Sequence, residues 1–175
     1  MSEIVNKYNR LARMLHWVSA LLIFGLFALG FWMIDLTYYS EWYNTAPFWH
    51  KSIGITLFGL TILRLIWKII SKNPPIDLTG RERKIAISMH HLLYLLLFII
   101  FISGYMISTA DGRAISVFNL FEIPGFGSFF ENQAALAGIV HKYVAYTVVG
   151  LAVLHGIVAI KHHVVNKDNT LKKML

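Results

Sequence analysis

The chain of 175 residues contains no cysteine. That absence excludes disulfide bonds, iron–sulfur clusters and thiolate zinc sites. Charged residues are also scarce, at 14% of the chain, whereas 57% of the residues are hydrophobic and the mean hydropathy is +0.58. This composition departs from soluble averages toward a protein that crosses a membrane several times. Any metal or cofactor must be held by nitrogen or oxygen ligands, and the eight histidines are the obvious supply.

Four apolar stretches are long enough to cross a bilayer as helices, at about residues 14–34, 48–70, 86–108 and 138–161. The first is longer than a usual signal-peptide core and ends in bulky residues rather than a small-residue cleavage site, so we expect a retained helix. We therefore predict an all-α, four-helix transmembrane bundle that forms a single domain over residues 1–175. The connection before the last helix, rich in phenylalanine and glycine, is expected to be a lid at the membrane interface, with a short amphipathic helix as an option.

The basic residues gather on one side of this predicted bundle. Four spans place both termini on the same side, and the positive-inside rule makes the basic side cytoplasmic. Twelve of the sixteen basic residues belong to the side of the termini: Lys7, Arg10, Arg13, Lys68, Lys72, Arg81, Arg83, Lys84, Lys161, Lys167, Lys172 and Lys173. The net charge of +7 therefore reflects orientation and predicts no nucleic-acid partner. We expect the basic C-terminal tail to be solvent-exposed.

Four histidines fall at two matched depths of the predicted bundle. His141 and His155 lie fourteen residues apart, about 21 Å along a helix and within about 40° of the same face. With the predicted topology, His50 starts the second helix at the outer depth of His141, and His16 starts the first helix at the inner depth of His155. Unpaired ionisable residues at membrane depth are costly, whereas a ligated imidazole has its lone pair occupied. We therefore predict two bis-histidine sites, one above the other.

The four histidines also allow other interpretations. Each one alone could be an interfacial side chain satisfied by lipid headgroups and water. Zinc is the other metal candidate, but it usually gathers three or four ligands at one point, and these two pairs are separated by about 21 Å in depth. Two iron porphyrins suit the arrangement better, so we predict that His16, His50, His141 and His155 ligate haem iron.

Several cations lie where haem propionates need partners. Arg64 follows His50 by fourteen residues, at the inner depth, and can bind a propionate; the other interpretation is a side chain that reaches the cytoplasmic interface. Lys51, Lys142 and Arg113 are the three basic residues on the outer side. They can contact propionates or gather an anionic substrate, and an ordinary surface role stays open because five acidic residues share that side.

Four further histidines lie near the inner side. His162 is seven residues beyond the inner histidine of the last helix, about 10 Å further on the same face. Its imidazole can bind a quinone carbonyl and deliver a proton; alternatively His162 and His163 belong to the basic tail. We expect His90 and His91 to contact a propionate or a lipid headgroup. The alternative is that one of them replaces His16 as the inner ligand.

The chain resembles bacterial cytochrome b561 proteins of the four-helix, di-haem type over essentially its whole length. The segments that carry the resemblance are KYNRLARMLHW, FWHKSIGI, HKYVAYTVVGLAVLH and KHHVVNKDNTLKKML. The fourteen-residue histidine spacing is shared with cytochrome b subunits of membrane hydrogenases and formate dehydrogenases, whereas the ending is closer to the b561 proteins. The resemblance implies an inner-membrane electron carrier with two b-type haems and ubiquinone or another quinone as acceptor, and it supports His162 over His163 as the quinone contact.

One branch of this family oxidises superoxide at the outer face and passes the electrons to ubiquinone. The resemblance therefore implies an oxidoreductase whose chemistry belongs to iron and quinone, with no side-chain nucleophile. The alternative function is a cytochrome b anchor that conducts electrons between a separate periplasmic dehydrogenase or hydrogenase and quinone. A haem-free four-helix transporter is the third possibility.

Overall fold

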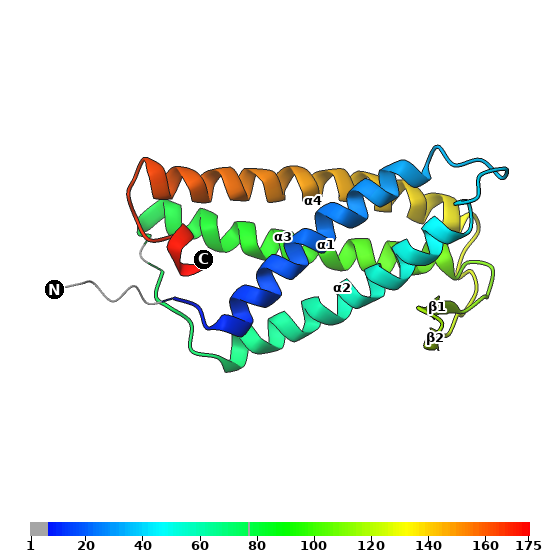
Figure 1. Ribbon diagram of the computed structural model, residues 1–175, viewed down its shortest axis with the longest axis horizontal. Coiled ribbons are helices and arrows are strands. Elements are labelled where there is room, and N and C mark those ends of the chain that lie inside the picture. Colours follow the sequence, from blue (N-terminus) through cyan, green and yellow to red (C-terminus); the bar gives the residue numbers. More distant parts are fainter. Residues whose placement is uncertain (1–6, 77) are drawn as a thin grey trace.

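The computed structural model describes residues 7–76 and 78–175 and is built on four long helices: α1 (Arg10–Met33), α2 (Thr45–Ile70), α3 (Gly80–Ser108) and α4 (Gln133–Val164). All four are long and apolar enough to cross a membrane. They form an elongated bundle in which the start of α1 and the C-terminal residues lie at one end, here called the termini end (Figure 1). The predicted four-helix transmembrane bundle is confirmed, and each helix starts three to six residues earlier than the sequence indicates.

Local sequence explains how the first two helices begin and end. The side chain of Asn9 caps α1 by accepting a hydrogen bond from the backbone N–H of Ala12 at 2.9 Å. The same oxygen accepts a hydrogen bond from Trp67 Nε1 near the end of α2 at 3.0 Å. Pro74 and Pro75 follow shortly after and prevent α2 from continuing. The start of α1 is thereby fixed beside the end of α2.

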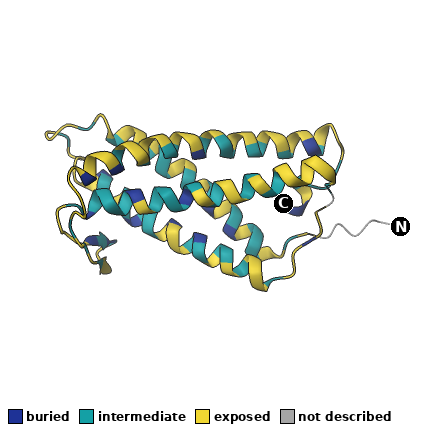
Figure 2. Ribbon diagram, turned by 180° about the vertical axis from the view of Figure 1, so that it is seen from behind, coloured by how far each residue is buried: buried dark blue, intermediate teal, exposed yellow. Residues whose placement is uncertain are grey.

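The bundle consists of two helical hairpins. The helix α1 packs mainly on α2, and α3 mainly on α4, with fewer contacts between the two hairpins. Few side chains are fully buried, as Figure 2 shows by the scarcity of dark blue. Among the buried ones are the small polar residues Ser19, Thr61 and Ser103, whose hydroxyls each donate to the carbonyl four residues earlier. These three hydroxyls are therefore paired within their own helices, as a lipid surrounding requires.

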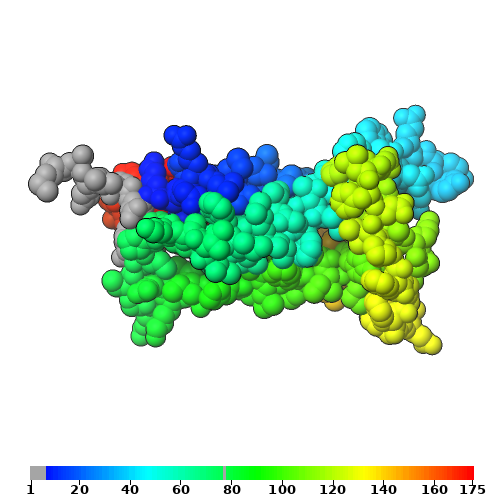
Figure 3. Space-filling model, turned by 90° about the horizontal axis from the view of Figure 1, so that it is seen from below, coloured from blue at the N-terminus to red at the C-terminus, as the bar shows by residue number. Residues whose placement is uncertain are grey.

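The connection between α3 and α4 forms a β-hairpin at the other end of the bundle, here called the hairpin end. Its strands are β1 (Ile115–Val117) and β2 (Phe121–Ile123), which pair antiparallel with Val117 opposite Phe121. Figure 3 shows this connection covering the end of the bundle beside the α1–α2 connection. No helix forms within residues 109–132, so the optional amphipathic helix is wrong. Instead, the two short paired strands satisfy backbone groups of their own residues.

The hairpin is attached to α2 by one buried hydroxyl. Ser52 is 0% exposed, and its Oγ accepts a hydrogen bond from the backbone N–H of Phe118 at 3.1 Å and donates to the carbonyl of Ser116 at 3.4 Å. On the other side, the buried amide of Gln133 accepts from the N–H of Phe129 at 2.8 Å and donates to a carbonyl near the end of α3 at 2.9 Å. The connection is therefore a fixed part of the fold.

The C-terminal residues 165–175, here called the C-terminal strap, fold back across the termini end. The expectation of a solvent-exposed basic tail is confirmed for Lys161, Lys167 and Lys172 and is wrong for Lys173. Lys173 is buried, and its ammonium donates a hydrogen bond to the carbonyl of Pro75 at 2.5 Å. Backbone carbonyls of the strap also accept hydrogen bonds from α1 and from the residue Tyr8 before it. Trp17 on α1 donates from Nε1 to the carbonyl of Met174 at 2.8 Å, and the backbone N–H of Tyr8 donates to the carbonyl of Lys173 at 3.1 Å.

Substitution of Ser52 tests whether the hairpin depends on this attachment. Ser52→Ala leaves the N–H of Phe118 without its partner, so we expect the free energy of unfolding to fall by about 1–3 kcal/mol. The thermal unfolding midpoint of detergent-solubilised protein measures this loss. Ser88→Ala, at an exposed position on α3, is the control. Equal midpoints for both variants would contradict the assigned role.

Candidate functional site

The structure brings together the two histidines predicted for the outer depth. His50 on α2 and His141 on α4 face each other near the hairpin end, with ring centroids 6.2 Å apart and ring planes at 67°. The Nδ1 atom of His141 lies 3.1 Å from the carbonyl oxygen of Ile100 on α3, to which it can donate. The Nδ1 atom of His50 is buried and has no hydrogen-bond partner among the described residues.

The two histidines predicted for the inner depth also meet, nearer the termini end. The ring centroids of His16 on α1 and His155 on α4 are 6.5 Å apart, with ring planes at 72°. A third imidazole joins them from α3, because the ring of His90 lies 5.2 Å from that of His155. The Nδ1 atom of His90 is hydrogen-bonded to the carbonyl of Ala86 at 2.7 Å. His91 is exposed and takes no part in this group.

Both predicted pairs have the separation that a shared metal ion requires. Two imidazoles bound on opposite faces of one metal, at about 2 Å per metal–nitrogen bond, have ring centroids about 6 Å apart. The measured 6.2 Å and 6.5 Å agree with that value, whereas the 5.2 Å between His90 and His155 is too short. Within residues 7–76 and 78–175, no three histidine or acidic side chains converge on one point as zinc would need. The donor set would therefore fit haem iron held by a pair of histidines, and the separation of His16 from His155 matches better than that of His90.

The pairs belong to two layers that run through all four helices. Each helix contributes one residue to each layer, and on every helix the two residues are fourteen positions apart. The hairpin-side layer consists of Gly30, His50, Gly104 and His141. The termini-side layer consists of His16, Arg64, His90 and His155.

Two glycines hold the imidazoles of the hairpin-side layer. A Cβ atom at Gly30 would lie 3.1 Å from Cε1 of His50, and a Cβ at Gly104 would lie 3.1 Å from Cε1 of His141. Any larger side chain would have to displace the ring, so glycine lets each backbone support an imidazole directly. The sequence analysis missed both residues. The signal that could have found them is their fourteen-residue spacing from His16 and His90.

Arg64 points into the termini-side layer. Its Nη2 donates to Nδ1 of His16 at 2.7 Å, and its Cζ lies 5.4 Å from the ring centroid of Tyr94. Lys68 Nζ lies 5.7 Å from the same ring. Burial raises the pKa of the nearby Tyr8 phenol, and the charge of Arg64 opposes that shift. The guanidinium thus faces the histidines and the aromatic rings, in a position to meet an anion there.

The three basic residues of the hairpin end differ in their exposure and in their pairing with carboxylates. Lys51 and Lys142 directly follow His50 and His141, and Lys142 is exposed. The side chain of Arg113 is 85% exposed and pairs with Asp111, with 2.5 Å between Nη2 and Oδ2. Hydrogen bonds from Arg113 lower the pKa of the Asp111 carboxyl, which stays ionised. Arg113 therefore adds little to a positive field at this end.

His162 lies at the end of α4 under the C-terminal strap. It is only 8% exposed, and its Nδ1 is 2.6 Å from Oδ2 of Asp168. The amide nitrogen of Asn166 is 3.2 Å from the same ring nitrogen. His163 is half-buried and its Nδ1 has no partner among the described residues. The sequence analysis missed Asp168, because helix periodicity gives no information about how a tail folds back.

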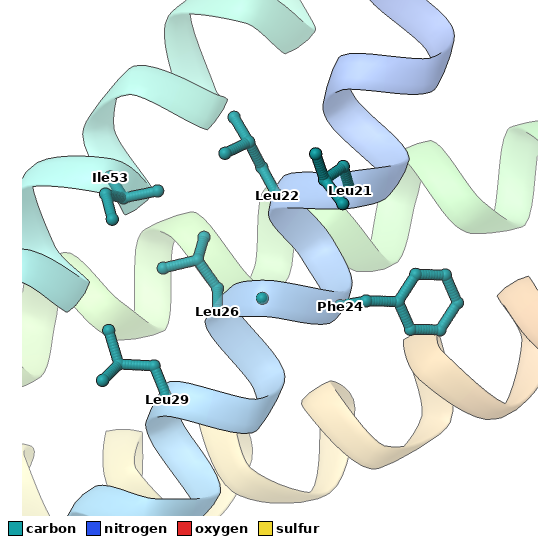
Figure 4. A pocket seen from close by; sticks show the side chains of 7 residues that line it. Leu21, Leu22, Phe24, Leu26, Leu29 and Ile53 are labelled. Carbon is teal, nitrogen blue, oxygen red and sulfur yellow. The ribbon is translucent and has the colours of Figure 1, made fainter.

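A separate hollow between α1 and α2 has no polar side chain. Its volume is about 330 Å³, and its lining includes Gly25, Phe24 and Ile53 (Figure 4). None of the histidines borders it. Such a surface suits a lipid acyl chain and offers no group for proton or electron chemistry.

The glycine support can be tested by adding one methyl group. In Gly30→Ala the added methyl group lies too close to the His50 ring, so either the ring or helix α1 must shift. We therefore expect haem affinity in the hairpin-side layer to fall about tenfold or more. Haem stoichiometry and the low-spin electron paramagnetic resonance spectrum of the purified protein measure this. Gly25→Ala is the matched control, since its Cβ would meet no atom within 4 Å. An unchanged spectrum in Gly30→Ala would contradict the positioning role.

Comparison with known proteins agrees with this geometry. The family model described as prokaryotic cytochrome b561 matches residues 7–175. Cytochrome b561 homolog 2 of Escherichia coli is 47% identical over 171 residues, which cover 97% of this chain and 91% of that protein. Probable superoxide oxidase CybB of Yersinia pestis is 26% identical over 178 residues, covering 97% and 96% of the two chains. Such proteins are membrane electron carriers with b-type haem, and this chain belongs to the prokaryotic cytochrome b561 family.

Proposed function

We propose that the protein holds two b-type haems, one in each layer, and passes electrons from a donor at the hairpin end to a membrane quinone at the termini end. The observation that carries this proposal is the pair of imidazole separations, 6.2 Å and 6.5 Å, at two depths of one bundle. His50 and His141 would hold one haem and His16 and His155 the other. Haem iron supplies reversible one-electron transfer when bound, and the protein supplies ligands, spacing and local charge.

Arg64 is assigned to a propionate of the termini-side haem. An imidazole that binds iron through Nε2 keeps its proton on Nδ1, so it no longer accepts a hydrogen bond there. Ligation by His16 would therefore leave the Arg64 guanidinium without its present acceptor and free to bind a carboxylate. Lys68, on the same helix and over the same Tyr94 ring, adds a second positive charge nearby.

Charge distribution supports an orientation with both termini in the cytoplasm of a bacterial inner membrane. Twelve of the sixteen basic residues belong to the termini side, as the positive-inside rule requires of a cytoplasmic face. The hairpin end then faces the periplasm, where the donor arrives. Quinone is reduced at the opposite end beside His162, with protons from the cytoplasm.

Superoxide is the proposed donor. Lys51 and Lys142 each follow a ligand of the hairpin-side layer, and positive charge beside a redox centre speeds capture of a small anion. A relative 26% identical to this chain is named a probable superoxide oxidase, which supports the same donor. The expected reaction is oxidation of superoxide to oxygen, with one electron passed on to the quinone for each superoxide oxidised.

A second candidate function is a membrane anchor for a separate periplasmic dehydrogenase or hydrogenase. The observation that favours it is the charge of the hairpin end, where Arg113 is paired with Asp111. The acidic residues exposed at this end are Asp35, Glu41, Asp111, Glu122 and Glu131. Because these residues are negatively charged, they would attract a protein donor with a basic surface and repel a small anion.

Substitution of the α4 histidines tests the ligand assignment. His141→Ala and His155→Ala should each lower the haem content from two to one per chain, because each removes one of the residues that would hold a different haem. Reduced-minus-oxidised spectra and haem stoichiometry measure the loss. His91→Ala, at an exposed position one residue from His90, is the control. Full haem content in both α4 variants would refute the assignment, and an absence of b-type bands in the unmodified protein would favour a transporter.

Stopped-flow mixing with superoxide tests the donor. We expect haem reduction by superoxide, and we expect Lys51→Gln combined with Lys142→Gln to slow it about tenfold, less so at high salt. Lys72→Gln, exposed at the opposite end, should leave the rate unchanged. No haem reduction by superoxide in the unmodified protein would exclude this donor and favour the anchor function.

A further inference from the structure

His162 is held by a carboxylate from the C-terminal strap. Its Nδ1 lies 2.6 Å from Oδ2 of Asp168, and the imidazole is buried while the carboxylate is about one-quarter exposed. The other carboxylate oxygen accepts a hydrogen bond from the backbone N–H of Thr170 at 2.8 Å. The backbone N–H of Asp168 donates to the carbonyl of His162 at 3.1 Å. Backbone and side chain together therefore fix Asp168 against this one histidine.

The charge state of Asp168 suits this contact. Partial burial by itself would raise the pKa of the Asp168 carboxyl, but the hydrogen bonds from Thr170 and the contact with His162 outweigh it and hold the pKa below its usual value. The carboxylate is ionised at neutral pH. It therefore accepts a hydrogen bond from Nδ1–H of His162, which leaves Nε2 as the ring nitrogen that can face a ligand.

The strap also connects this pair to the termini-side layer. Trp17 donates from Nε1 to the carbonyl of Met174 at 2.8 Å, and its ring lies edge-on to that of His16 with centroids 5.4 Å apart. Lys173 is buried and bonded to the carbonyl of Pro75 in the α2–α3 connection. Asp168 is thus carried by a segment docked on both hairpins, next to the proposed point of electron exit.

We propose that Asp168 is the positioning residue for proton delivery by His162 to the quinone. This inference rests on the proposed function. Reduction of a quinone to a quinol takes two electrons, supplied by the b-type haems, and two protons. His162 as imidazolium passes one proton from Nε2 to a quinone oxygen and is reprotonated at Nε2 by water, which also supplies the second proton. Throughout, Asp168 stays ionised, stabilises the imidazolium and keeps the remaining proton on Nδ1.

The experiment compares four variants of the haem-loaded protein in quinone reduction, with a short-chain ubiquinone analogue as acceptor. Asp168→Asn keeps the size of the side chain but removes the negative charge, so we expect kcat to fall about tenfold or more with little change in KM. Asp168→Glu should restore part of kcat. Lys172→Gln, exposed on the same strap, should behave as the unmodified protein. His162→Ala tests the quinone site itself.

Hydrogen–deuterium exchange of residues 166–175 separates positioning from folding of the strap. We expect Asp168→Asn to leave this exchange and the haem spectrum unchanged while kcat falls. Unchanged kcat in Asp168→Asn together with slow reduction by His162→Ala would overturn the role of Asp168 alone. Normal reduction by His162→Ala would instead overturn the proposed quinone site. Faster exchange and equal loss of kcat in both Asp168 variants would assign the carboxylate to strap folding and also overturn the inference.

Discussion

The placement of imidazoles in two layers, fourteen residues apart on each helix, is the constraint on which the rest of the structure depends. Fourteen residues return an α-helix to nearly the same face about 21 Å further along. Four helices in register therefore present two sets of four residues toward the bundle axis. Buried imidazoles need partners, and the two facing pairs provide a geometry that one metal ion per layer would satisfy.

The two layers differ in what surrounds their histidines. This difference suits the proposed electron transfer from the hairpin end to the termini end. Glycines support the hairpin-side imidazoles, and the polar side chain beside them is the neutral Ser103, whose Oγ lies 3.2 Å from His141 Nδ1. Arg64 and His90 occupy the matching positions of the termini-side layer and bring charge and polarity beside His16 and His155. Positive charge near a redox centre favours its reduced form. The polar layer also lies next to the strap, where electrons and protons must meet if a quinone is reduced.

The C-terminal strap folds back on the bundle, which the lysine-rich sequence of this segment does not indicate. A lysine-rich ending normally indicates a solvated tail, yet here backbone carbonyls accept bonds from Trp17 and the strap returns Asp168 to His162. Lys173 can be buried because its ammonium group reaches the carbonyl of Pro75. His162, for which the sequence left open a quinone contact or a place in a basic tail, is thus buried beside a fixed carboxylate.

The sequence by itself determined the four spans and predicted the two depths and the four proposed ligand positions, because hydrophobic length and helix periodicity are local properties of the chain. It predicted His16 as the inner ligand and left His90 or His91 open as the alternative, whereas the structure distinguishes His16 from His90 by their ring distances from His155, 6.5 Å and 5.2 Å. It could not predict the β-hairpin attached through Ser52 or the contact of Asp168 with His162. Those depend on which helix faces which and on where connecting segments return, and only tertiary contacts decide that.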